Sequence, residues 1–178
     1  MSSGFVPVRQ LVLVDLLSMV LGVRPGERAV VAVDTAAESG TFHLCAELRA
    51  LAAHVGGREL RTLGLSEVDA GPRDGLLRRF RAGEPFVASM DERRGRTVEP
   101  ERDWHPTPDA VLLVAGSFLL RPALATRWDA SVYVETEVTG SAAEHLYREQ
   151  VPEQQATWVL DNRRQGAPTL TYGAIVDP

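Results

Sequence analysis

His43 is the residue in this chain whose type and position best suit proton transfer. It lies near the start of a predicted helix, and a helix N-terminus disfavours a charged imidazole. The ring would therefore stay neutral at neutral pH and could accept a proton as a general base. Glu67 or Asp34 is the acidic residue that could orient it. The alternative interpretation is an exposed histidine without a catalytic role.

The composition excludes several kinds of chemistry. All 19 basic residues are arginine, so no lysine can neutralise a phosphate or form a Schiff base. Cys45 is the single cysteine, which rules out an internal disulfide, and its place on an apolar helix face predicts a buried thiol. The four histidines lack metal-ligand spacing, so we expect neither a metal nor another cofactor.

The charge balance and the hydropathy pattern bear on partners. A net charge of −5 argues against nucleic-acid binding, which needs a basic face. The apolar run Leu11–Leu21 contains Asp15 and is too short to span a bilayer. We therefore interpret it as a buried helix of a cytoplasmic protein with no membrane partner.

The elements that would position these side chains follow from the hydrophobic periodicity. Apolar residues recur at helical spacing over Arg9–Leu21 and Phe42–Ala52, which predicts two helices. Arg28–Val33 is a valine-rich run typical of a strand buried on both faces, and Leu60–Leu65 predicts the next strand. With the polar loop Thr35–Gly40 between the first strand and the second helix, this part is a βαβ unit.

Strands and helices continue to alternate along the rest of the chain. The remaining predicted elements are helix Asp74–Arg81, strand Ala110–Val114, short helix Arg121–Arg127, strand Ser131–Val134, helix Ser141–Glu149 and strand Thr157–Leu160. This pattern predicts an α/β fold with a central parallel sheet and helices on both faces. Phe86–Val98 fits it poorly, so we expect a small hairpin or irregular arm at about 83–105 within one domain covering 1–178.

A set of short segments also occurs in the order of a known family. It begins with Val30–Asp34, Gly57-Arg58-Glu59 and Pro108–Val114, and it continues with Gly116, Phe118–Pro122, Leu124, Trp128-Asp129, Tyr147, Val151-Pro152, Gln154 and Asp161-Asn162. In this respect the chain resembles the uridine kinase-like proteins of the phosphoribulokinase/uridine kinase group. The resemblance covers most of the chain and implies a three-layer P-loop kinase-like fold.

The chain departs from that family at the phosphate-binding loop. The motif G-x-x-x-x-G-K-[ST] has Thr35 at its first glycine, Thr41 at its lysine and Phe42 at its Mg²⁺-binding hydroxyl residue. Phosphoryl transfer depends on positioning and on offsetting the charge of the triphosphate, and these residues cannot supply either. The comparison with the family therefore implies that ATP phosphotransfer has been lost.

Three further family positions are changed. Ser66 stands at the aspartate of the segment that normally supplies a catalytic base, and Ala115 replaces an acidic residue expected after the next strand. The arginine-bearing lid that closes over ATP is replaced by a shorter segment beginning with Glu135. Carboxylates in this place would repel an anionic ligand rather than clamp it.

The positions that would contact the nucleoside differ less from the family than the positions that would contact phosphate. Asp91 and Arg93 fit a family stretch of the form aromatic-Asp-x-Arg beside the nucleoside sugar, with Met90 at the aromatic position. The resemblance implies a polar floor for a neutral, hydroxylated or aromatic ligand, and the alternative is a surface ion pair. The candidate catalytic residues are His43, Glu67 and Asp91. The candidate ligand-binding residues are Asp34, Ser66, Arg93, Glu135 and Tyr147.

The sequence leaves more than one function open. In the first, the old cleft holds a small organic molecule and performs ATP-independent cyclisation, isomerisation, hydrolysis or elimination, as in secondary metabolism. In the second, the chain is an inactive pseudokinase that serves as a binding or assembly partner. Phe42 would then fill the cleft, and the arm or the tail Thr169–Val176 would add strands to a partner. Related kinases assemble as oligomers, so we expect a homodimer. The third is a residual uridine or cytidine kinase, against which the missing lysine argues most strongly.

Overall fold

The computed structural model describes residues 7–36, 41–65, 73–85, 104–137, 140–164 and 166–173. The arm expected at Phe86–Val98 lies outside these ranges, so the prediction of one domain with a small arm stays a prediction.

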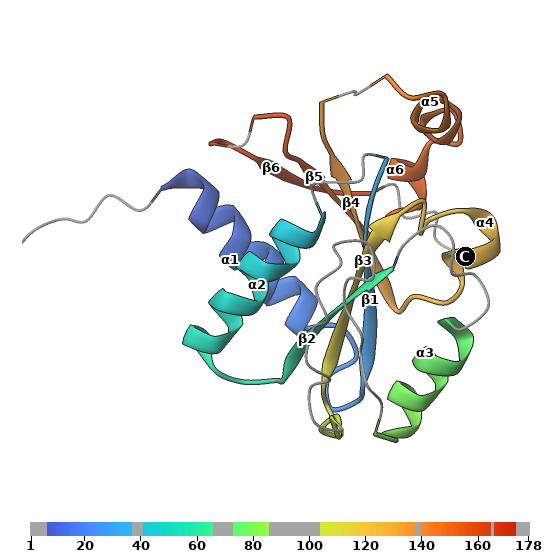
Figure 1. Cartoon of the computed structure of the whole chain (residues 1–178). Helices are drawn as coiled ribbons and strands as arrows, with labels where there is room; N and C mark the ends of the chain where they lie inside the picture. Colours follow the sequence, from blue (N-terminus) through green and yellow to red (C-terminus); the bar gives the residue numbers. More distant parts are fainter. Residues whose placement is uncertain are drawn as a thin grey trace, which may run out of the picture.

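A six-stranded sheet forms the centre of the molecule (Figure 1). Its strands are β1 (Ala29–Thr35), β2 (Leu60–Leu65), β3 (Val111–Ser117), β4 (Ala130–Glu135), β5 (Trp158–Asp161) and β6 (Thr169–Tyr172). Their spatial order is β2-β3-β1-β4-β5-β6. The strands β1 to β5 are parallel to their neighbours, whereas β6 runs antiparallel to β5. The predicted parallel sheet is therefore confirmed for five strands and corrected at the sixth.

Helices cover both faces of this sheet because the apolar strands bury side chains on both sides. On one face, α1 (Val8–Leu21) and α2 (Thr41–Val55) pack on alternate residues of β1, including Val31 and Val33. On the other face, α3 (Arg73–Ala82) packs Phe80 against Val30 and its neighbours, and Phe80 stacks on Trp104 with ring centroids 5.8 Å apart. Cys45 of α2 is buried in the first of these clusters, and burial raises the pKa of its thiol to about 12, which keeps it protonated.

The first helix is buried on one side only, which corrects the expectation of a buried helix. Leu16 and Leu17 are buried against the sheet, but Val8, Leu11 and Val14 are exposed, Leu11 by 54%. A helix in the outer layer of an α/β fold needs only one apolar stripe, because its far side faces water. No helix in the described ranges is long and apolar enough to cross a membrane.

Arg58 fastens the end of α1 to the sheet. It lies just before β2, and its guanidinium donates hydrogen bonds to the backbone carbonyls of Leu21, Val23, Arg24, Glu27 and Asp109. Leu21 is the last residue of α1, and a cation is favoured at a helix C-terminus. The planar, five-donor side chain of arginine suits several carbonyls at once. The family-like segment Gly57-Arg58-Glu59 therefore has a structural role in this chain.

Short helices lie in the connections from β3 to β4 and from β4 to β5. These are α4 (Pro122–Ala125), α5 (Ala142–Arg148) and α6 (Pro152–Gln155), and the sequence did not predict the last of them. Ser141 caps α5: the Glu144 N–H donates to Ser141 Oγ at 3.1 Å, and the Glu144 carboxylate accepts from the N–H of Gly140, the residue before the cap, at 3.2 Å. This cap sets the orientation of α5, which carries Tyr147.

The tail beyond residue 168 forms a strand of the chain's own sheet. Thr169–Tyr172 pairs as β6 with β5, and the expectation that the tail Thr169–Val176 adds a strand to a partner stays a prediction. The register is continuous from Trp158 opposite Tyr172 to Asp161 opposite Thr169. Alternation in the sequence predicted a strand here, but it could not show which strand it would pair with.

Candidate functional site

The strand order points to one end of the sheet as the place for a ligand. The chain passes from β1 to β2 and β3 on one side and then to β4 and β5 on the other, so the order reverses around β1. Ligands of open α/β sheets bind beyond the carboxyl ends of the strands at such a reversal. In this chain those ends are Thr35, Ser117 and Glu135, on β1, β3 and β4. We call this region the switch point.

Asp34 is the buried acid of the switch point. It lies on β1 opposite Gly116 of β3 and Tyr133 of β4, and it is fully buried. Its carboxylate accepts a 2.8 Å hydrogen bond from the Leu119 N–H and a short one from the Tyr147 hydroxyl. Burial raises the pKa of Asp34 to about 7, although the hydrogen bonds from Tyr147 and Leu119 partly offset that rise.

Tyr147 connects α5 to this acid. It is buried, and its hydroxyl donates to Asp34 while accepting a 3.2 Å hydrogen bond from the Leu120 N–H. Its ring meets that of Phe118 edge-on, with centroids 4.8 Å apart. Burial and then the Asp34 charge raise the pKa of Tyr147, so the hydroxyl keeps its proton and stays a donor. The structure thus brings together two of the predicted ligand-binding residues, Asp34 and Tyr147.

The segment after β3 closes over this pair. Phe118 has a positive φ of 61°, its N–H donates to the Thr35 carbonyl at 3.4 Å, and Arg121 lies over its ring at 4.7 Å. The side chains that pack together here are Ala36, Phe118, Leu120, Tyr133, Tyr147 and Ala156. In the described part of the chain, the switch point is therefore filled by packed side chains and a satisfied hydrogen-bond network.

The start of α2 carries the residues that replace the phosphate-binding lysine and the Mg²⁺ ligand. Thr41 is buried, and its Oγ1 has no hydrogen-bond partner among the described residues. Phe42 is 41% exposed, and a Cβ built at Gly64 of β2 would overlap its ring, so the ring packs on β2. Gly64 lies near the carboxyl end of β2, and the expectation that Phe42 fills the cleft stays a prediction.

His43 lies on the outer side of α2. Its side chain is 79% exposed, and Nε2 lies 3.6 Å from a carboxylate oxygen of Glu47, one turn along the helix. Asp34 bonds to Leu119 and Tyr147 instead, so the structure does not pair His43 with Asp34. The other proposed partner, Glu67, lies outside the described residues, as do Ser66, Asp91 and Arg93.

Glu135 is held at the end of β4 by basic and backbone groups. Its carboxylate lies 3.4 Å from Arg163, which also pairs with Asp161, and its carbonyl accepts from the Asn162 N–H at 2.9 Å. This arrangement ties the ends of β4 and β5 together. The described contacts of Glu135 are therefore structural and leave its role in ligand binding a proposal.

Arg148 is a residue of this region that the candidate set omitted. It extends from α5 to the Thr136 carbonyl at 3.1 Å and to the buried Glu144 carboxylate at 3.2 Å, while its Nε is buried without a partner in the described part of the chain. An arginine thus lies beside the segment where the family lid was expected. The sequence feature that could have identified Arg148 is its position directly after Tyr147. It was not decisive, because an arginine on a helix usually points to solvent.

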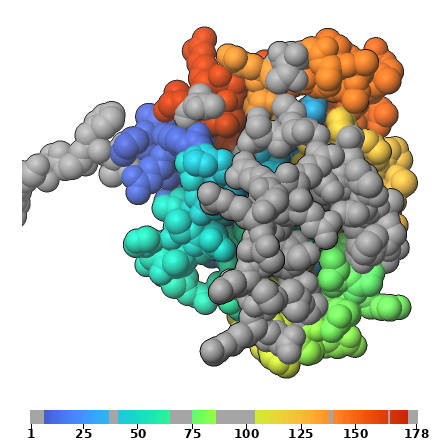
Figure 2. All heavy atoms as spheres, viewed as in Figure 1, coloured from blue at the N-terminus to red at the C-terminus, as the bar shows by residue number. Residues whose placement is uncertain are grey.

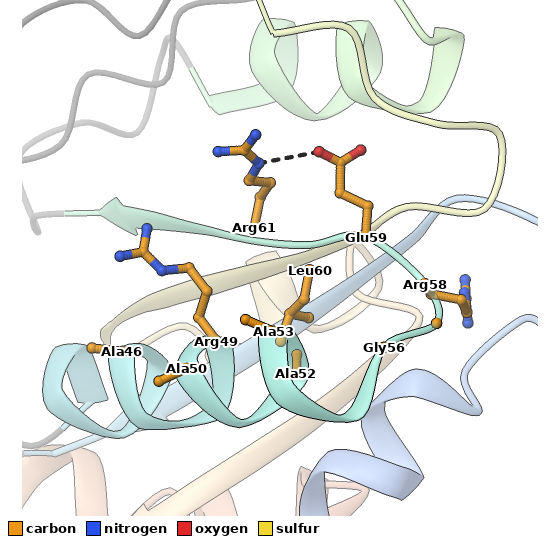
Figure 3. Close-up of a pocket in the computed structure, with 11 residues that line it drawn as sticks. Ala46, Arg49, Ala50, Ala52, Ala53, Gly56, Arg58, Glu59, Leu60 and Arg61 are labelled. Atoms are coloured by element: carbon orange, nitrogen blue, oxygen red, sulfur yellow. Dashed lines mark hydrogen bonds and ion pairs between the residues drawn. The ribbon is translucent and has the colours of Figure 1, made fainter.

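A groove lies at the opposite end of the sheet, between α2 and β2 (Figure 3). It has a volume of about 560 Å³ and a floor of alanines from α2. Of its charged residues, Arg58 bonds to backbone carbonyls and Arg61 pairs with Glu59, as Figure 3 shows. Because these groups are engaged and the groove lies at the amino end of β2, it does not belong to the switch point. In the described ranges no group of acidic, histidine or cysteine residues is arranged to hold a metal ion.

Comparison with known proteins bears on the fold. No protein-family model and no curated protein matches this sequence. Among solved structures, one described as a possible uridine kinase from Bacillus stearothermophilus is similar over 85% of this chain and 98% of its own, with a TM-score of 0.66. The chain has a P-loop kinase-like fold. The 17% sequence identity extends this conclusion to the fold alone, and the predicted three-layer α/β architecture is confirmed.

Proposed function

We propose that this chain keeps the kinase-like fold without transferring phosphate from ATP, and that it works as a binding or assembly protein. The observation that carries the proposal is the filled switch point. Asp34, Tyr147 and the Leu119 and Leu120 N–H groups satisfy one another at the carboxyl end of β1, the region where open α/β sheets bind ligands. A ligand that enters among the described side chains has to displace buried groups that already have partners, which is costly.

The start of α2 supports the same proposal. Phosphoryl transfer needs cationic groups and a metal ligand at the triphosphate. Thr41 and Phe42 stand at those positions, the ring of Phe42 packs on Gly64, and the chain has no lysine to substitute from elsewhere. Arg148 is the nearby cation on α5, and its described contacts are with Glu144 and the Thr136 carbonyl.

The second candidate is a repurposed enzyme acting on a small organic molecule without ATP. Asp34 favours it, because a carboxyl with a pKa near 7 beside a tyrosine hydroxyl is suited to proton transfer at neutral pH. Such an enzyme would have to open the segment Phe118–Leu120. Its candidate catalytic residues besides Asp34 are His43, Glu67 and Asp91.

A thermal-shift titration tests these proposals. The full chain is heated with ATP–Mg²⁺, with uridine, with cytidine and with a panel of neutral small molecules. A specific ligand raises the melting temperature according to RT ln(1 + [L]/Kd). We expect no shift with any of them. A shift with ATP–Mg²⁺ would overturn the loss of phosphoryl transfer, and a shift with a neutral molecule alone would favour the repurposed enzyme.

A matched variant separates ligand binding at the switch point from binding elsewhere. Tyr147→Phe removes the hydroxyl that closes the network but keeps the ring that packs on Phe118. A ligand that enters the switch point should bind this variant with a changed Kd in isothermal titration. A ligand that binds both proteins equally lies at another surface.

A further inference from the structure

The outer edge of β6 is the feature that carries this inference. β6 is the last strand of the sheet order, and in the described part of the chain no strand pairs with its other side. It lies beside α1, and Leu170 packs into the core under that helix. Figure 2 shows the N-terminal helix in blue next to the C-terminal strands in orange and red at one margin of the molecule. β6 therefore ends the sheet at the surface.

The direction of its backbone groups can be deduced from the ladder. The Gly173 N–H donates to the Thr157 carbonyl at 3.0 Å, so residue 173 faces β5. Backbone groups alternate in direction along an antiparallel strand. Thr171 and Thr169 therefore face β5 as well, and the N–H and C=O groups of Leu170 and Tyr172 point to the outer edge.

This edge lacks most of the features that usually prevent strand pairing. Natural edge strands are protected by charges, proline, a bulge or a very short length, and of these β6 has the short length, with four residues. Thr169-Leu170-Thr171-Tyr172 has no charge and no proline, and its register with β5 is unbroken. Threonine and tyrosine favour strands, and Tyr172 is 68% exposed.

We propose that β6 pairs antiparallel with β6 of a second copy of this chain, around a twofold axis. An edge strand presents donors and acceptors in alternation, so it complements itself without any other chemistry. A charged partner would have no matching charge on this strand. The pairing would join the two sheets into one and keep both α1 helices on the same face.

The symmetry also determines the register. Only one twofold register uses the outward groups of both Leu170 and Tyr172, and it places Leu170 of each copy opposite Tyr172 of the other. Each such pair exchanges two backbone hydrogen bonds. Thr171 then lies on the axis, opposite Thr171 of the second copy, in a non-hydrogen-bonded pair. Tyr172 covers Leu170 of the second copy on the face that carries α1.

The inference specifies the partner for the assembly role proposed above, and it rests on that proposal because only an assembly protein needs a partner. The two can fail separately. A monomer that does not bind ATP–Mg²⁺ would overturn the dimer and leave the loss of phosphoryl transfer standing. A dimer that binds ATP–Mg²⁺ would overturn the loss of phosphoryl transfer and leave the dimer standing.

Sedimentation equilibrium of the full chain and of three variants tests the dimer. Thr171→Glu places two like charges opposite each other on the axis, whereas Thr169→Glu puts the same charge on the same exposed face away from the axis. We expect the wild type to dimerise, the Thr171→Glu dimer to be roughly fivefold weaker, and the Thr169→Glu dimer to be nearly unchanged. An equal mixture of Thr171→Glu and Thr171→Arg should recover wild-type association.

A cysteine variant tests the register. Cα atoms of a non-hydrogen-bonded pair are about 4.5 Å apart, within the range of a disulfide. With oxidised glutathione as the oxidant, Thr171→Cys should form a covalent dimer and Thr169→Cys should not, while the buried Cys45 stays unreactive. A wild type that is monomeric, or position 169 variants that behave like those at position 171, would overturn the proposal.

Discussion

The Tyr147 hydroxyl of α5 donates a hydrogen bond to the buried Asp34 carboxylate on β1. This contact joins the central strand to a helix near the C-terminal end of the chain. It also brings the Tyr147 oxygen within reach of the Leu120 N–H, so one hydroxyl satisfies two partners. The network is therefore sensitive to the loss of a single atom.

Tyr147→Phe should destabilise the fold by about 1–3 kcal/mol. The substitution keeps the ring but leaves the Asp34 carboxyl short of a donor and the Leu120 N–H without its acceptor. Urea unfolding followed by circular dichroism measures the change. The control is Tyr172→Phe, whose side chain is exposed and should change the free energy of unfolding very little. Equal effects at both positions would contradict the structural role of the Tyr147 hydroxyl.

Asp34→Asn should remove one component of the pH dependence of stability. In the folded protein the pKa of Asp34 is raised to about 7 from its ordinary value of 3.8, mainly by burial. The folded state therefore binds this proton more tightly than the unfolded state does. Wild-type stability should fall, through this group, as pH rises from about 4 to about 7, and then level off.

The measurement is the free energy of unfolding in urea at several pH values across that window. Other acids act in the opposite direction: burial alone would raise the pKa of Asp129, but the Val30 N–H and the Arg24 and Arg81 guanidiniums hold it below its usual value. The informative quantity is therefore the difference between wild type and Asp34→Asn. As pH rises, the free energy of unfolding of the variant should increase relative to that of the wild type. A difference in free energy that stays constant with pH would contradict the raised pKa of Asp34.

Gly64→Ala should destabilise the protein through Phe42. A Cβ at residue 64 would overlap the Phe42 ring, so the ring or strand β2 must shift. An overpacked contact of this kind costs about 1–3 kcal/mol. In a Phe42→Ala background the same substitution should cost little, because the space is free. A double-mutant cycle measured by urea unfolding would show this coupling, and additive effects would mean that the ring does not pack there.

Arg58→Lys should destabilise the protein although it keeps the charge. Lysine has a single ammonium and cannot reach the carbonyls that the guanidinium joins, among them those of Leu21 and Asp109. Because these carbonyls would lose their donors, we expect the free energy of unfolding to fall by about 1–3 kcal/mol. Arg49→Lys is the matched control, because Arg49 lines the same groove but is exposed. Thermal unfolding of the two variants should separate them clearly.

Much of the architecture was predictable because local sequence patterns determine its helices and strands. The apolar residues of α1 and α2 recur at the spacing of one helix face, and the valine-rich run Ala29–Thr35 is typical of a strand buried on both faces. The absence of lysine and the residues at positions 41 and 42 are also read directly from the sequence, without any structure. These features identify the fold class and motivate the proposed loss of phosphoryl transfer.

Tertiary structure alone decided which of these side chains meet. Asp34 and Tyr147 are 113 residues apart, and nothing in their local sequence shows that α5 turns its tyrosine toward β1. His43 has the right residue type near the right loop, yet α2 presents it to solvent beside Glu47. β6 was predicted as a strand, but its antiparallel place next to β5 depends on the whole sheet. Periodicity determines the face on which a side chain lies, whereas the order and packing of the strands and helices determine what that face contacts.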